Sequence, residues 1–169
     1  TGLAVESPER LGITGTGWIE QAFRWARAAD PGAKLYYNDY NNELTGYAKG
    51  DAVYAMAQDF VSRGVPLDGI GMQVHVVAGT GWPNPANVRA QINRITALGL
   101  DVEITELDVR IQSPTDAGKL AQQAATAQAI IDACLDNPRC RTIQWWGHTD
   151  NYSWIPGTFP GYDDGLLLD

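Results

Sequence analysis

Apolar positions along the chain follow two spacings, one typical of helices and one typical of strands. Apolar residues recur every three or four positions in four segments, at 18–30, 51–63, 84–98 and 115–134. Short runs rich in β-branched and aromatic residues alternate with them, at 33–38, 69–76, 102–109 and 141–147. The pattern therefore predicts four helices and four strands in alternation.

Each predicted helix carries one apolar stripe that we expect to face the core. Asn84 followed by Pro85 is a helix start, and Gly64 and Gly99 are helix ends. The expected stripes are Ile19, Ala22, Phe23 and Ala26, then Val53, Met56, Ala57 and Phe60, then Val88, Ile92 and Ile95, and last Leu120, Ala124, Ala127 and Ile131.

The regular alternation predicts parallel βα units in an α/β fold. Two architectures accept such units, an open doubly wound sheet or part of a closed (β/α)8 barrel (a TIM barrel). No glycine-rich turn follows the first strand, and polar residues stand at the carboxyl ends of all four strands, which favours the barrel. We expect residues 1–169 to form one domain, with a loop-rich tail at 150–169 in which "LLLD" is a possible short element.

Composition narrows the possible partners. The chain has 169 residues and a formal net charge of −8, and its 12 Lys and Arg form no basic stripe, which argues against nucleic acid. No apolar run is long enough to span a membrane, and no pattern marks a signal peptide, so we expect a soluble chain. Six Trp and seven Tyr suit neutral partners such as sugar rings, although most Trp residues belong to cores.

The two cysteines, Cys134 and Cys140, are separated by the turn "LDNPR". They are close enough to bridge, and a lasting disulfide implies an oxidising compartment. A buried, reduced pair is the alternative.

Strand alternation places the candidate catalytic and binding side chains on the interior face of the sheet. Gln73 and His75 share one face of the second strand, and Asn38 and Tyr40 share one face of the first. By the same alternation, Ile104, Glu106 and Asp108 share a face of the third strand. Buried carboxylates need partners or a function, so Glu106 and Asp108 are the leading candidates.

Other interpretations of these residues remain open. The carboxylates could belong to an ion-pair network that only supports the loops, or His75, Glu106, Asp108 and Asp150 could hold a metal, although no ligand pair has helix spacing. No G-x-S-x-G motif supports serine chemistry. Trp146 and Trp154 could wall a sugar subsite, whereas we expect Trp145 to pack in the core.

Several segments together resemble the retaining endo-β-1,4-xylanases of glycoside hydrolase family 10. "AFRWARAADPGAKLYYNDYN", "GIGMQVHV", "LGLDVEITELDVR", "CLDNPRC" and "WWGHTDNYSW" are similar to the fifth to eighth strands of that family, in order. The resemblance covers nearly all of the chain and about half of the enzyme. It implies the second half of a TIM barrel, with no metal and no cofactor.

The resemblance also implies roles for individual residues. Glu106 would be the nucleophile, with His75 and Asp108 holding it, and Gln73 would bind the sugar at the cleavage point. Trp146 and Trp154 would wall that subsite, and Cys134 and Cys140 would form a disulfide common in the family. The residues expected on the leaving-group side are Asn38, Tyr40 and Asn41.

A retaining glycosidase needs a second carboxyl group as general acid and base. In the family this glutamate follows an asparagine after the fourth strand, and neither Glu6 nor Glu9 shows that pattern. We therefore expect the acid to come from a segment absent from these residues, and the isolated chain to be inactive. Trp145 and His148 depart from the aliphatic residues expected beside Trp146.

The resemblance predicts how the chain is assembled and where it works. Half a barrel has two open edges, near 35–40 and 142–147, so we expect the other half, or a second copy, to pair with them. The expected partner is xylan or a xylo-oligosaccharide, and the expected location is extracellular. The alternatives are a carbohydrate-binding fragment without catalysis and a related β-1,4-glucanase.

Overall fold

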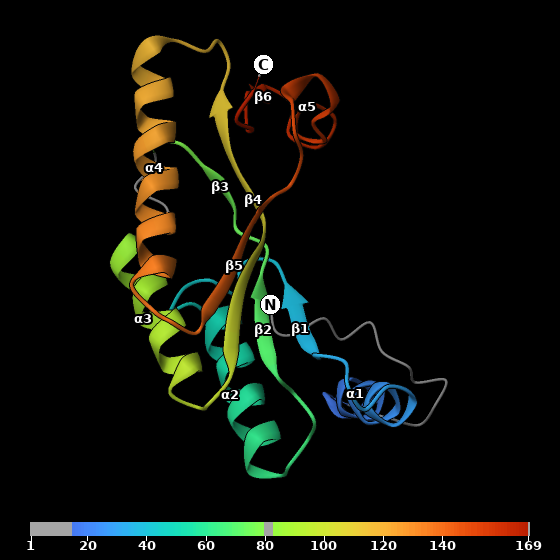
Figure 1. The fold of residues 1–169 in the computed structure, drawn as a ribbon. Helices are drawn as coiled ribbons and strands as arrows, with labels where there is room; N and C mark the ends of the chain where they lie inside the picture. Colours follow the sequence, from blue (N-terminus) through green and yellow to red (C-terminus); the bar gives the residue numbers. More distant parts are fainter. Residues whose placement is uncertain (1–14, 80–82, 169) are drawn as a thin grey trace.

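The computed structural model describes residues 15–79 and 83–168, and these confirm the predicted alternation (Figure 1). No helix within these ranges is long and apolar enough to cross a membrane. The main elements are α1 (Gly17–Ala29), β1 (Tyr36–Asp39), α2 (Ala48–Ser62), β2 (Gly69–Met72), β3 (His75–Val77), α3 (Pro85–Thr96), β4 (Asp101–Gln112), α4 (Ala117–Leu135) and β5 (Cys140–Trp145).

The strands form a parallel sheet in the order β1, β2, β4, with β3 and β5 also paired to β4. Helices α2, α3 and α4 lie on one face of this sheet, and α1 lies beside β1 (Figure 1). Helices on one face are typical of an arc of a barrel, whereas a doubly wound sheet carries them on both. Among the described strands, β1 pairs only with β2 and β5 only with β4, so both open edges are present.

Helix packing confirms some of the expected stripes. All four stripe residues of α2 and all three of α3 are buried. In α1, Ile19 and Phe23 are buried but Ala22 is exposed. Asn84 caps α3 as predicted, because its side chain accepts the Ala86 N–H at 2.9 Å.

Of the four residues in the expected stripe of α4, only Ala127 is buried. Leu120 and Ala124 are exposed, and the buried residues are Ala127, Ile130, Ala133 and Cys134. Apolar residues occur on all sides of this helix, so apolar spacing alone did not distinguish the two faces. The Gln123 side chain of this helix also contacts the sheet, by donating to the Val109 carbonyl of β4 at 2.9 Å.

The tail contains more structure than predicted, although not at "LLLD". It forms a 3-10 helix (η2, Asp150–Tyr152), a short helix α5 (Ile155–Thr158) and a two-residue strand β6 (Tyr162–Asp163). Strand β6 pairs antiparallel with the end of β4 at Ile111 and Gln112. The residues of "LLLD" that the structure describes, 166–168, form no helix or strand.

The loop between β1 and α2 is fixed to the helix layer by Gln91. This fully buried side chain of α3 donates to the carbonyl oxygens of Asn42 at 2.8 Å and Gly50 at 3.1 Å. A β-carbon on Gly50 would lie 2.0 Å from the Leu44 carbonyl oxygen, so only glycine fits there. The residues just after β1 are therefore held in one position.

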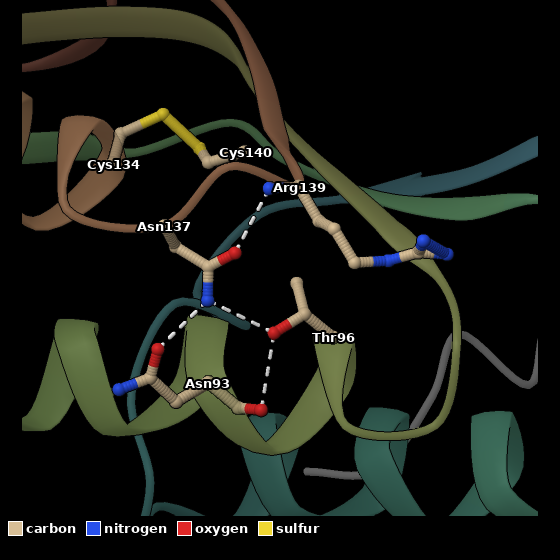
Figure 2. The surroundings of a disulfide bond; sticks show 6 residues. All are labelled: Asn93, Thr96, Cys134, Asn137, Arg139 and Cys140. Atoms are coloured by element: carbon tan, nitrogen blue, oxygen red, sulfur yellow. Dashed lines mark hydrogen bonds between the residues drawn. A yellow bond between two sulfur atoms is a disulfide. The ribbon is translucent and has the colours of Figure 1, made fainter.

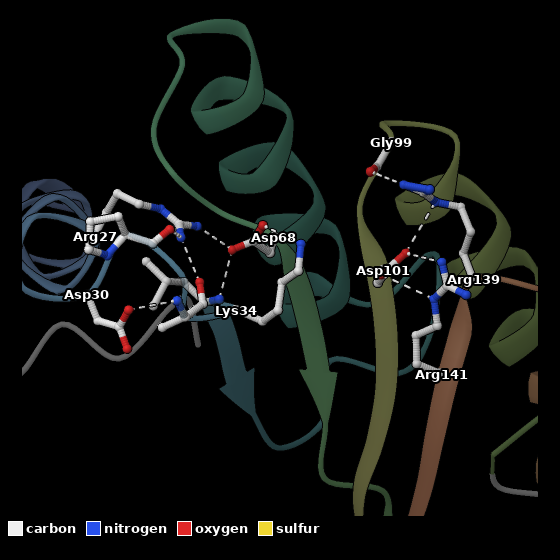
Figure 3. Close-up of polar contacts among 11 residues, drawn as sticks. Arg27, Asp30, Lys34, Asp68, Gly99, Asp101, Arg139 and Arg141 are labelled. Atoms are coloured by element: carbon white, nitrogen blue, oxygen red, sulfur yellow. Dashed lines mark hydrogen bonds and ion pairs between the residues drawn. The ribbon is translucent and has the colours of Figure 1, made fainter.

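Two aspartates tie the amino ends of the strands together (Figure 3). Asp68 accepts from the Arg27 guanidinium at 2.5 Å and from the Leu35 N–H at 2.9 Å. Asp101 pairs with Arg139 at 3.4 Å and Arg141 at 3.2 Å. These contacts lie at the opposite end of the sheet from the polar carboxyl ends and point to a structural role.

Cys134 and Cys140 form the predicted disulfide, with their Cα atoms 5.3 Å apart (Figure 2). The turn that they enclose is also held by Asn137. Its amide donates to Asn93 Oδ1 at 2.8 Å and to Thr96 Oγ1 at 3.0 Å, and its Oδ1 accepts the Arg139 N–H at 2.9 Å. The turn is thus held both by the disulfide and by the hydrogen bonds of Asn137 to α3.

Replacing both cysteines by alanine is expected to lower the free energy of unfolding by about 2 kcal/mol, the loop-entropy value for so short a closed segment. The Asn137 contacts should keep the fold intact. Urea denaturation of the double variant measures the change, and the wild-type chain in reductant should show the same shift. An unchanged midpoint in both would contradict a stabilising disulfide.

Candidate active site

A cleft of about 590 Å³ opens at the carboxyl ends of the strands. Seven of the nine residues predicted for the site line it, and the other two, Asn38 and Asp108, contact residues that do. The lining consists of Tyr40, Asn41, Gln73, His75, Glu106, Arg110, Trp146, Trp154 and Phe159.

An irregularity in β4 places Glu106 in the cleft. The register between β4 and β5 shifts between Ile104 and Leu107, as in a β-bulge. Before the shift Val102 and Ile104 pack against the helices, and after it Leu107 and Val109 do so. The expected shared face of Ile104, Glu106 and Asp108 is therefore wrong. Ile104 is a core residue, whereas Glu106 lines the cleft.

Two side chains hold the Glu106 carboxylate, whose side chain is 13% exposed. Asn38 donates its Nδ2 to Glu106 Oε1 at 3.1 Å, while its Oδ1 accepts from Thr105 Oγ1 at 2.7 Å. His75 Nε2 lies 3.3 Å from Glu106 Oε2. Glycine at position 71 gives Asn38 its space, because a β-carbon there would lie 2.5 Å from Asn38 Oδ1. Each carboxylate oxygen of Glu106 thus faces a different partner, Oε1 facing Asn38 and Oε2 facing His75.

His75 bridges two carboxylates. Its Nδ1 lies 2.8 Å from Oδ2 of the fully buried Asp108, and its Nε2 faces Glu106. An imidazole with protons on both nitrogens donates to both carboxylates. Burial lowers the pKa of His75, but the hydrogen bonds to Asp108 and Glu106 outweigh it, so the pKa lies above the ordinary histidine value.

This raised pKa predicts a pH dependence of stability. A group whose pKa is higher in the folded state adds stability below its unfolded pKa of about 6.5, and this is lost as the pH rises through the folded pKa. We expect the free energy of unfolding to fall over that window, and to fall less in His75→Gln. Urea denaturation of both proteins from about pH 6 to 9 measures this. Parallel curves would contradict the assignment.

Two tryptophans stand beside His75. The Trp154 indole donates its Nε1 to Asp108 Oδ2 at 2.8 Å, and its ring lies 4.8 Å from the His75 ring. The Trp146 ring lies 6.3 Å from that of His75 and is 48% exposed. Trp145, as expected, packs against the hydrophobic core instead. The indole rings therefore provide flat apolar walls next to Glu106.

The second predicted strand is interrupted at Val74, and polar residues that line the cleft stand on both sides of the interruption. The segment 69–76 forms β2 and β3 rather than one strand, and Val74 between them has a φ of 62°. This conformation is unfavourable for a β-branched side chain and tends to occur at functional sites. Both Gln73 and His75, on either side of Val74, line the cleft.

Tyr40 and Asn41 form another part of the lining. Tyr40 follows β1 directly and is 55% exposed, and Asn41 takes a left-handed φ of 55°. Asparagine tolerates this conformation better than most residues. The turn keeps both side chains at the cleft, as predicted.

Sequence reasoning missed two lining residues, Arg110 and Phe159. The Arg110 guanidinium carbon lies 4.0 Å from the centre of the Phe159 ring, a cation–π contact. Strand alternation from Asp108 would have found Arg110. Phe159 lies in the tail, where sequence gave no periodic signal.

Besides Glu106 and Asp108, a third carboxyl group lies near the site. It belongs to Glu43, which was not predicted from the sequence. It is 1% exposed, and burial raises its pKa, against the lowering effects of nearby backbone N–H groups and of the charges of His75 and Lys49. No side chain within the described part of the chain donates a hydrogen bond to either of its carboxyl oxygens. Its position two residues after the cleft residue Asn41 was the available signal.

The four residues considered for a metal site do not come together as one. Asp150 accepts the Leu166 N–H at 3.0 Å in the tail, while His75, Glu106 and Asp108 form the cluster above. Residues 15–79 and 83–168 contain no group of three His, Cys, Asp or Glu side chains placed to hold a metal ion. Glu6 and Glu9 lie outside the described residues.

Comparison with known proteins gives one consistent family. The family model of glycosyl hydrolase family 10 matches residues 6–169. The chain is 40% identical to endo-1,4-beta-xylanase 1 of Gibberella zeae over 163 residues, and 43% identical to endo-1,4-beta-xylanase B of Thermotoga neapolitana over 157 residues. These matches cover 93% and 92% of this chain but only 46% and 44% of the relatives.

Solved structures agree with this comparison. Xylanase 10B from Thermotoga petrophila, solved with xylobiose, matches 94% of the chain and 48% of its own length, with 45% identity and a TM-score of 0.87. Native xylanase 10B from Thermotoga maritima matches 100% of the chain and 53% of its own length, with 43% identity and a TM-score of 0.89. The chain thus spans about half the length of the relatives it matches.

Proposed function

Because the chain belongs to glycosyl hydrolase family 10, we propose that it supplies the second half of a retaining endo-β-1,4-xylanase. One observation carries the proposal. Glu106 stands in a cleft walled by tryptophans, with Asn38 at 3.1 Å and His75 at 3.3 Å from its two oxygens. A fixed, partly exposed carboxylate beside aromatic walls suits attack on a sugar.

In this mechanism Glu106 attacks the anomeric carbon of a xylose unit. The bond to the departing sugar oxygen breaks, and a covalent glycosyl ester forms on Glu106, which water then hydrolyses. Asn38 and His75 orient the carboxylate, and Asp108 fixes His75 from behind. Gln73 binds the sugar at the cleavage point between Trp146 and Trp154, and Tyr40 and Asn41 contact the leaving-group side.

The departing oxygen needs a general acid about 5 to 5.5 Å from the nucleophile. Asp108 does not suit this role, because its side chain is fully buried behind His75 and is hydrogen-bonded to His75 and Trp154. We propose that a carboxyl group outside these 169 residues is the acid, and that the chain alone does not hydrolyse xylan steadily.

The same proposal places another half barrel against the two open edges. A groove of about 440 Å³ between α1 and β1, lined by apolar side chains such as Trp18, Phe23 and Leu35, extends one edge. Exposed strand edges and apolar grooves favour association with a further sheet. A structure of the assembled enzyme should show a strand hydrogen-bonded to residues 36–40. An open edge there would contradict this.

We further propose that the protein works outside the cell. The disulfide between Cys134 and Cys140 supports this location, since disulfides persist in oxidising compartments.

A carbohydrate-binding role without catalysis is the second candidate. Glu106 is the only carboxylate among the described lining residues, which favours binding alone. A substrate that needs no acid separates the two roles. We expect 2,4-dinitrophenyl β-xylobioside to release one equivalent of dinitrophenolate per chain in a burst, followed by a slow phase that azide accelerates.

Each alternative predicts a different outcome of this experiment. A binder would retain xylobiose affinity but show no burst. A glucanase would react faster with the corresponding cellobioside than with the xylobioside. Either result would overturn the xylanase proposal.

A further inference from the structure

Lys49 lies directly beneath the ring of Tyr40. Its Nζ is 3.4 Å from the centre of that ring and 2.6 Å from Asp39 Oδ1. The side chains of Lys49 and Asp39 are only 12% and 10% exposed. A salt bridge shielded from water in this way is screened less by solvent and holds its geometry better than a surface pair.

Asp39 connects the pair to the strand and to Tyr40 itself. Its Oδ1 also accepts the Tyr40 N–H at 2.9 Å, and its Oδ2 accepts the Tyr37 hydroxyl at 2.7 Å. Burial and this hydrogen bond raise the pKa of Tyr37, so its hydroxyl stays a donor. Asp39 therefore fixes the backbone of Tyr40 while Lys49 fixes its ring.

The position of Lys49 is not favourable for the helix that carries it. It lies in the first turn of α2, where the partial positive charge of the helix terminus disfavours a cation. Helix stability alone thus gives no reason for a lysine at this position. Its contacts with Asp39 and Tyr40 do.

Tyr40 is the exposed member of this cluster and lines the cleft. Since Lys49 covers one face of its ring, the other face is left for the cleft. A ring held in one orientation loses no rotational freedom when a sugar stacks on it, which favours binding.

We propose that the Lys49–Asp39 pair is a positioning device that holds Tyr40 as the stacking surface for the sugar on the leaving-group side. This inference rests on the proposed function, because it needs a sugar in the cleft. Lys49 itself does not line the cleft.

The test isolates the leaving-group side. The chain is first labelled with 2,4-dinitrophenyl 2-deoxy-2-fluoro-β-xylobioside, which fills the other side covalently. The labelled protein is then titrated with xylobiose by calorimetry. We expect Lys49→Met to weaken this binding about 3- to 30-fold, the range of a partly buried cation–π contact. The labelling rate at saturating reagent should change much less.

Two further variants guard against a general loss of structure. Lys34→Met removes a lysine just before β1, at the end of that strand opposite to Tyr40, with a side chain 74% exposed, and should leave xylobiose affinity unchanged. In a Tyr40→Ala background, Lys49→Met should have no additional effect, because the ring it positions is gone.

The outcomes separate the two proposals. Failure of the wild-type chain to be labelled would overturn the proposed function, and this inference with it. Successful labelling with equal xylobiose affinity in the wild-type and Lys49→Met proteins would overturn this inference alone. A loss of affinity that persists in the Tyr40→Ala background would also contradict it.

Discussion

Replacing Glu106 by glutamine is expected to abolish the dinitrophenolate burst, with a loss of at least about 10⁴-fold in rate, as for removal of other covalent nucleophiles. Glutamine keeps the shape of the side chain but cannot form the glycosyl ester. Glu106 is the only carboxylate among the described residues that line the cleft, so no neighbouring acid is placed to replace it. Stopped-flow absorbance measures the burst.

Glu103→Gln is the matched control. Glu103 lies on the same strand, three residues earlier, and does not line the cleft. Burial raises the pKa of Tyr36 to about 12, together with the negative charges of Glu103 and Asp101 and a hydrogen bond to Glu103. The burst should survive in Glu103→Gln. A burst of normal rate in Glu106→Gln would remove Glu106 from the mechanism.

Replacing Asp108 by alanine is expected to lower the free energy of unfolding by about 3 to 5 kcal/mol, the usual effect of breaking a buried charged pair. The side chain is fully buried, and its loss leaves Trp154 Nε1 and His75 Nδ1 without an acceptor. With His75 no longer fixed, the burst should also slow by about 10²-fold, as expected for a misplaced reacting group. Urea denaturation and the burst assay measure the two effects.

Asp136→Ala is the control for this variant. Asp136 pairs with Arg89 at 2.6 Å on the surface, and its side chain is 61% exposed. An exposed pair contributes at most about 1 kcal/mol, so this variant should be nearly as stable as the wild type. Equal stability of the two variants would show that Asp108 has no special role.

The sequence predicted elements best where the spacing was unambiguous. In α2 and α3 most large apolar residues occur on one side, and all residues of the predicted stripes are buried. In α4 apolar residues occur on every side, so the spacing did not show that Ile130 and Cys134 are on the buried side, where Gln123 contacts β4. That contact joins distant segments and leaves no local signal.

The site was predicted more completely than the local geometry that forms it. Polar residues at strand ends identified Glu106, His75 and Gln73, because parallel strands bring their carboxyl ends together. Simple alternation failed at the register shift in β4. The break at Val74 was not predicted, although Gln73 and His75 line the cleft as alternation had placed them. Nothing in the sequence indicated a role for Lys49. That role depends on contacts with Tyr40 and Asp39, which lie outside its helix and are brought beside Lys49 only by folding.

Mapping the covalent label is the most direct test of Glu106 as the nucleophile. The chain is inactivated with 2,4-dinitrophenyl 2-deoxy-2-fluoro-β-xylobioside, digested, and the modified peptide is sequenced by mass spectrometry. We expect a single fluoroxylobiosyl ester on Glu106. A label on any other carboxylate, or a protein that binds xylobiose yet stays unlabelled, would contradict the account.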